Sequence, residues 1–138
     1  MIYLLYGEEE FLRSEALARI KAALGDVEMA SLNTVWIDGW RTSLAEVQMA
    51  CDALPFLAER RLVIVEGLWS RLSSRERKGK EAGDAQEAVE SEADEGKGML
   101  QDLLEYLEHV PETTDLVFDE SGKVKDVVAT RFYKHLAA

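Results

Sequence analysis

Acidic residues follow several apolar segments of this sequence, and their side chains are the ones best suited to chemistry. They lie in Gly7-Glu8-Glu9-Glu10, Asp38-Gly39, Glu66-Gly67 and Asp119-Glu120. Carboxylate oxygens bind hard divalent cations. A divalent-metal-dependent hydrolase or a degenerate NTPase is therefore one candidate function, with the candidate residues Glu8, Glu9, Asp38 and Glu66. The alternative, which we favour, is that the three glutamates form a first helix turn, where negative charge suits the helix dipole.

The loop after the first apolar segment does not have the composition of a phosphate-binding loop. Such a loop needs several glycines and a Lys-Ser or Lys-Thr pair. This sequence has Gly7-Glu8-Glu9-Glu10-Phe11-Leu12-Arg13 instead, and its three carboxylates would repel a phosphate. We therefore expect no nucleotide and no other cofactor.

Other residue types that carry catalysis stand alone in this chain. Cys51 is the only cysteine and falls on the apolar stripe of an expected helix, so we expect a small core residue. His109 and His135 have no serine, cysteine or second histidine at triad or ligand spacing, and we expect both at the surface. The three tryptophans, Trp36, Trp40 and Trp69, are expected to pack, and Trp40, which follows a turn, is the one of them that most favours exposure. We expect no catalytic, cofactor-binding or metal-binding residue.

One apolar pair is better suited to binding than to packing. Phe56-Leu57 stands between Pro55 and the charged Glu59-Arg60-Arg61, outside the periodic pattern of the preceding helix. An exposed apolar pair on an acidic protein predicts a protein-binding tip. The alternative is that both side chains fold back under the sheet.

The apolar pattern alternates between strands and helices. Strands are expected over 2–6, 32–37, 62–66 and 115–118, and helices over 8–24, 44–54, 99–109 and 124–136. This alternation predicts a single α/β domain over 1–138, with a parallel sheet that has helices on both faces. Residues 70–98 are basic, then acidic, with few large aliphatic residues, so we expect a mobile charged insertion there. A solvated helix with opposite-charge pairs is the alternative.

Composition narrows the class of partner. The 138 residues are 47% hydrophobic and 31% charged, with a formal net charge of -11. This content suffices for one domain with a core, but the charge argues against independent binding to a nucleic-acid backbone. A protein partner with a basic or apolar surface fits better. Without a leader peptide or an apolar stretch of membrane-spanning length, we expect a cytoplasmic protein with no membrane contact.

Three stretches carry a family resemblance. They are Tyr3 to Arg13 (YLLYGEEEFLR), Leu54 to Val65 (LPFLAERRLVIV) and Pro111 to Phe118 (PETTDLVF). In this order and spacing they resemble the N-terminal domain of the delta subunit of the bacterial DNA polymerase III clamp loader. The resemblance implies an AAA+/RecA-like domain that lacks a phosphate-binding loop. It also implies a non-catalytic subunit that binds the sliding clamp and helps to open it for loading onto primed DNA.

The same resemblance assigns site residues and partners. In the family an adjacent hydrophobic pair on a short helix enters an apolar pocket of the clamp, and the matching positions here are Phe56 and Leu57. We expect support from Leu54, Pro55, Arg60 and Arg61, the arginines either as rim charges or paired with neighbouring glutamates. The family continues into domains that join other loader subunits. We therefore expect a monomeric first domain of a longer protein, which meets DNA only indirectly and leaves catalysis to the polymerase complex.

Overall fold

The computed structural model describes residues 1–7, 9–72 and 88–120, with side chains of the last range described from Gly98 onward. Glu8 of the candidate carboxylate set lies outside the described residues, as do the expected last helix over 124–136 and His135 within it.

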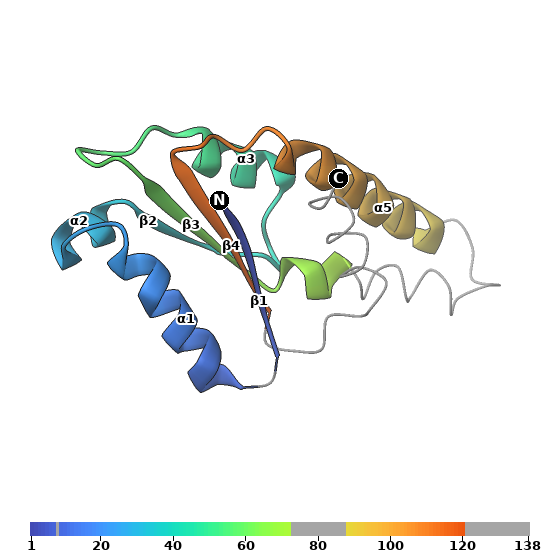
Figure 1. Ribbon diagram of the computed structural model, residues 1–138. Coiled ribbons are helices and arrows are strands. Elements are labelled where there is room, and N and C mark those ends of the chain that lie inside the picture. Colours follow the sequence, from blue (N-terminus) through green and yellow to red (C-terminus); the bar gives the residue numbers. More distant parts are fainter. Residues whose placement is uncertain (8, 73–87, 121–138) are drawn as a thin grey trace.

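A parallel sheet of four strands forms the centre of the domain (Figure 1). The strands are β1 (Ile2–Tyr6), β2 (Thr34–Asp38), β3 (Arg61–Glu66) and β4 (Thr114–Glu120), and their order is β1-β4-β3-β2. All of the pairings are parallel. The central strands β3 and β4 are the most deeply buried of the four, because a central strand in such a sheet is covered on both faces. The expected parallel sheet is confirmed.

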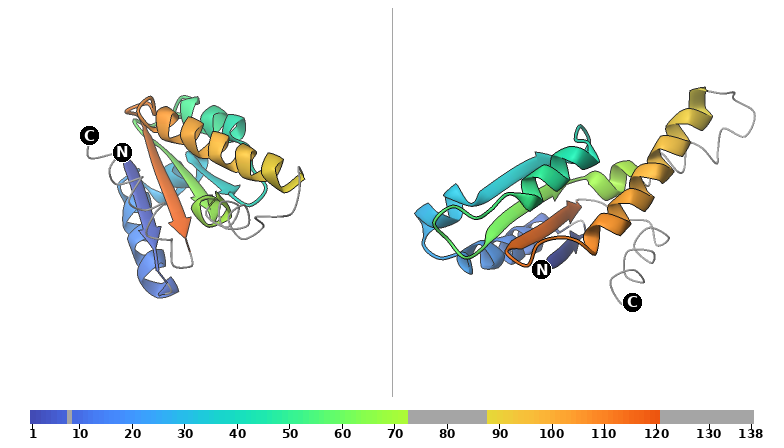
Figure 2. Two further views of the ribbon diagram at one scale, coloured as in Figure 1. Left: turned by 90° about the vertical axis from the view of Figure 1, so that its right-hand side faces the viewer. Right: turned by 90° about the horizontal axis from the view of Figure 1, so that it is seen from above.

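Helices cover both faces of the sheet (Figures 1 and 2). α1 (Glu10–Ala22) and α2 (Val27–Leu32) lie on one face, and α3 (Leu44–Asp52) and α5 (Ala88–Leu107) lie on the other. Successive side chains of β3 point to opposite faces. Leu62 and Ile64 therefore pack towards α1, and Val63 and Val65 pack towards α3 and α5. The expected α/β class with two helical layers is confirmed.

The larger core lies between the sheet and helices α3 and α5. A short helical turn over 68–72 contributes to it, and its Trp69 meets Phe118 edge to face with ring centroids 5.3 Å apart. Cys51 is fully buried in the same core, and burial raises the pKa of its thiol to about 12. A thiol that keeps its proton is a poor nucleophile, so Cys51 is the packing residue that the sequence predicted.

Several element boundaries differ from the sequence prediction. α2 was not expected; it begins after Asp26, whose carboxylate accepts a hydrogen bond from the Met29 N–H at 2.8 Å. Because α2 ends at Leu32, the second strand begins at Thr34 rather than at residue 32. β4 extends through Glu120, where a turn was expected. The buried Glu120 carboxylate accepts bonds from the Trp69 N–H at 2.8 Å and the Ser70 hydroxyl at 2.7 Å.

Both ends of the 70–98 stretch are helical. Residues 70–72 continue the turn that begins at 68, and α5 begins at Ala88 rather than at 99. The expected boundaries of the insertion are therefore wrong within the described residues. The remaining part, 73–87, lies outside them, and its mobility stays a prediction.

Candidate functional site

The segment between α3 and β3, residues 53–60, places apolar side chains at the surface. We call it the tip loop; it is the green loop at the upper left of Figure 1. Ala53 ends α3 with an extended backbone, and Pro55 follows soon after. Phe56 is 56% exposed, Leu57 is 75% exposed and Leu54 is 83% exposed. The pair therefore points outward, and the alternative that it folds under the sheet is wrong.

The pair lies on a bend rather than on a short helix. Residues 53–60 contain no helical residue, and Leu57 has a φ of 52°. This left-handed conformation is uncommon for residues other than glycine, and Pro55 restricts the residue before it to extended geometry. Both features oppose continuation of α3. The helix that the resemblance implied at this position is thus corrected to a loop.

Asn33, the residue that follows α2, fixes the tip loop through hydrogen bonds to the backbone of Phe56. Its side chain is fully buried. The Phe56 N–H donates to Asn33 Oδ1 at 2.6 Å, and Asn33 Nδ2 donates to the Phe56 carbonyl at 2.9 Å. A further bond from Asn33 Nδ2 to the Met29 carbonyl, at 3.0 Å, ties the same amide to α2. The backbone of Phe56 is therefore fixed while its ring is left exposed.

The two arginines expected to support the pair hold the base of the loop. Arg60 donates two hydrogen bonds to the Asp115 carboxylate, from Nε at 3.0 Å and from Nη2. Burial raises the pKa of Asp115, but the hydrogen bonds from Arg60 and the Met1 ammonium outweigh it and hold that pKa below its ordinary value. Arg61 Nε donates to the Ala50 carbonyl of α3 at 2.8 Å. Arg60 is therefore paired within the domain, but with an aspartate 55 positions away in the sequence rather than with a neighbouring glutamate.

The candidate carboxylates of the opposite edge are only partly brought together. Asp38 and Glu66 are register partners at the carboxyl ends of β2 and β3. They line a pocket of about 490 Å³, where Arg13 donates to Asp119 at 2.6 Å. Glu9 lines a different pocket, beside β1. Within the described residues, no three His, Cys, Asp or Glu side chains are placed to hold a metal ion together.

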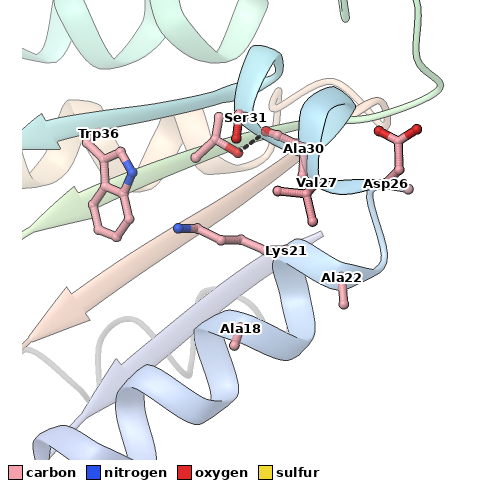
Figure 3. A pocket seen from close by; sticks show the side chains of 10 residues that line it. Ala18, Lys21, Ala22, Asp26, Val27, Ala30, Ser31 and Trp36 are labelled. Atoms are coloured by element: carbon pink, nitrogen blue, oxygen red, sulfur yellow. Dashed lines mark hydrogen bonds between the residues drawn. The ribbon is translucent and has the colours of Figure 1, made fainter.

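A larger and more apolar pocket lies between α1, α2 and β2 (Figure 3). Its volume is about 680 Å³, and none of the candidate site residues lines it. Trp36, which was expected to pack, does line it. Trp36 is half-exposed rather than packed inside, with the Lys21 ammonium 4.6 Å from its ring centroid. Trp40 is also half-exposed, and Trp69 is buried as expected.

Sequence reasoning missed the two residues that anchor the tip loop. Asn33 was placed inside a strand, and Asp115 was treated only as a strand residue. A polar residue inside an apolar segment, such as Asn33 in Leu32-Asn33-Thr34-Val35, is a usable signal because a buried amide needs partners. The identity of those partners, Phe56 and Met29, could not be read from it.

Among the helices within the described ranges, none has both the length and the apolar character needed to cross a bilayer.

Comparison with known proteins identifies the family. The family model described as DNA polymerase III, delta subunit, matches residues 3–137. The DNA polymerase III subunit delta of Bacillus subtilis (strain 168) is 35% identical over 65 residues, which are 47% of this chain and 19% of that protein. The Bacillus subtilis DNA clamp loader delta protein shares the fold, with a TM-score of 0.67 and 24% identity.

That structural match covers 97% of this chain and 36% of the other chain, so the present chain spans only part of the length of both relatives. The shared fold agrees with the α/β domain that the resemblance implied. The family model covers nearly every residue. This chain belongs to the DNA polymerase III delta subunit family.

Proposed function

We propose that this domain is a non-catalytic module of a clamp loader, which binds the sliding clamp through Phe56 and Leu57. The observation that carries the proposal is the tip loop itself: two adjacent large apolar side chains are exposed on a backbone held by hydrogen bonds to the buried Asn33 side chain. An aromatic and an aliphatic anchor are typical of an interface hot spot. Membership of the delta family supports the sliding clamp as the partner.

The energetics of the pair fit such a contact. Each side chain would contribute about 1.5–3 kcal/mol when it leaves water for an apolar pocket. Leu54 adds exposed apolar surface beside the pair, and Pro55 stiffens the approach to it. Arg60 and Arg61 act by holding the base of the loop, because their donors are engaged within the domain. In the complete protein, we infer, this contact helps to open the ring for loading onto primed DNA.

The other partners follow from the same proposal. Contacts with the remaining loader subunits belong to parts of the delta subunit beyond this region, since the relatives are much longer. The domain then meets DNA only through the assembly, and its replication role places it in the cytoplasm. No observation in the described part of the chain favours the hydrolase or NTPase alternative as a second function, because Glu9 does not line the pocket that holds Asp38 and Glu66.

Titration of the cognate sliding clamp tests the proposal. The Phe56→Ala/Leu57→Ala variant should bind about a hundredfold more weakly or worse, because both anchors lose their burial in the clamp. The chain offers a matched control in Phe11 and Leu12, the same pair of residue types, exposed on α1. The Phe11→Ala/Leu12→Ala variant should bind like the unmodified domain.

Circular dichroism should show that both double variants remain folded. Unchanged clamp affinity in the folded Phe56→Ala/Leu57→Ala variant would remove the proposal. Equal losses in the two double variants would show that exposed apolar surface in general, rather than the tip loop, carries the binding.

A further inference from the structure

We infer that Asn33 is the positioning residue of the tip loop: its buried side chain holds Phe56 so that Phe56 and Leu57 meet the partner in one fixed conformation. The inference rests on the proposed clamp-binding function and names a residue, outside the apolar pair, on which that function depends. Asn33 itself does not touch the partner, because its side chain is fully buried.

The hydrogen bonds of the Asn33 amide are complete and directional. The oxygen accepts from the Phe56 N–H, and the nitrogen donates to the carbonyls of Phe56 and Met29. A flipped amide would set a donor against the Phe56 N–H and an acceptor against its carbonyl. Both polar groups of one tip residue are therefore bound by one side chain from a distant part of the sequence.

The backbone of Asn33 fixes the amide in turn. Its N–H donates to the Met29 carbonyl at 3.1 Å, and its carbonyl accepts from the Leu62 N–H of β3 at 2.8 Å. The residue thus sits where α2 ends beside the sheet, joined to both. The position of the tip loop is therefore fixed through Asn33 by α2 and β3, rather than by the short sequence of the loop itself.

The hydrogen bonds between Asn33 and Phe56 affect how tightly the tip loop binds its partner. A free loop with an exposed apolar pair samples many conformations, and ordering it weakens association. Leu57 adopts a left-handed φ of 52°, which a leucine keeps only where its surroundings hold it. The hydrogen bonds at Phe56 act on the residue directly before Leu57. They order the loop before the partner arrives, and so the domain binds more tightly than the same residues would as a flexible segment.

Two substitutions test the role of the amide. Asn33→Ala removes all three side-chain bonds, and Asn33→Asp keeps the shape but replaces the donor to the Phe56 carbonyl. Both variants should bind the cognate clamp about tenfold more weakly, and the Phe56 amide proton should exchange faster. The control is Asp26→Ala, which removes the cap at the other end of α2. It lowers the melting temperature but should leave clamp affinity within about twofold.

The outcomes separate this inference from the proposed function. If the unmodified domain binds the clamp and Phe56→Ala/Leu57→Ala does not, then unchanged affinity in folded Asn33 variants overturns the inference alone. If the unmodified domain fails to bind, the proposed function fails, and hydrogen exchange decides about Asn33. Slow exchange of the Phe56 amide, relative to Leu57 and Ala58, is expected in the unmodified domain whatever the variants do. If the Phe56 amide exchanged as fast as those of Leu57 and Ala58, the inference about Asn33 would be overturned.

Discussion

Two buried carboxylates of β4 show how single side chains respond to their surroundings. Burial raises the pKa of Glu120, and the Ser70 hydroxyl with the amides of Trp69 and Ser70 offsets this only in part. Asp115 is buried as well, but Arg60 and the Met1 ammonium bring its pKa below the ordinary value. The difference is the nearby positive charge, since neutral donors stabilise a carboxylate less than cations do.

The pairing of Asp115 predicts a pH-dependent contribution to stability. Its pKa in the folded protein lies below the ordinary value of 3.8, so the ion pair stabilises the fold above that pH and is lost as the pH falls through the lower, folded value. Asp115→Asn should cost about 1 kcal/mol at neutral pH, a modest figure because Arg60 is 40% exposed. Urea denaturation at neutral pH and near pH 3 measures the gap between the two proteins.

That gap should shrink in acid, and a gap of the same size at both pH values would contradict the assignment. Glu120 is present in both the unmodified domain and the Asp115→Asn variant, so its own effect on stability cancels from the difference between them. Glu15→Gln provides a control, because the Arg19–Glu15 pair is exposed with a 3.4 Å separation. It should change stability little at either pH.

At the scale of elements, the sequence could predict features that depend on nearby residues, but not contacts between residues far apart in the chain. The strands were predictable because burial on both faces requires continuous apolar runs such as Leu62 to Val65. α2 was not, since only Ala30 of its six residues is buried and no apolar stripe marks it. The neighbours of the Phe56-Leu57 pair left its outward orientation open, and the family resemblance favoured it. The Asn33 and Asp115 anchors were not predictable, because they join residues 23 and 55 positions apart.

The connection from β2 to α3 depends on a glycine for reasons of space. The Gly39 N–H donates to the Glu66 carbonyl at 2.7 Å. A Cβ at this position would lie 2.4 Å from the Leu68 backbone nitrogen and 2.5 Å from the Glu66 carbonyl oxygen. Because these are backbone atoms, the connection and the 68–72 turn would have to separate. Gly39 is thus where two βα connections touch.

Gly39→Ala should therefore destabilise the domain by about 1–3 kcal/mol, the usual range for an overpacked site. Gly98 supplies the matched control, since it lies within α5 and a Cβ there would meet no atom within 4 Å. Gly98→Ala should stabilise the domain by about 0.5–1 kcal/mol through helix propensity. Thermal or urea denaturation compares the two, and equal effects would contradict the packing argument.

At the scale of the whole molecule, the two edges of the sheet have different characters. The tip loop precedes β3 and therefore lies at the amino-terminal edge, where it exposes Leu54, Phe56 and Leu57. The carboxyl edge presents Asp38, Glu66 and Asp119, with Arg13 paired to Asp119. In open α/β sheets the carboxyl edge is the usual ligand site. The proposed function of this domain uses the other edge.

This separation predicts that the carboxyl edge is dispensable for the clamp and unresponsive to nucleotide. Its carboxylates repel phosphates, and the guanidinium of Arg13, which lines the pocket, is held by Asp119 at 2.6 Å. Millimolar magnesium and ATP should therefore leave the melting temperature unchanged, since a ligand stabilises only the state that it binds. Asp38→Asn/Glu66→Gln should keep full clamp affinity. A magnesium- or nucleotide-dependent shift in the unmodified domain that disappears in this variant would instead support the metal-dependent enzyme, and would place the working site at the edge opposite Phe56.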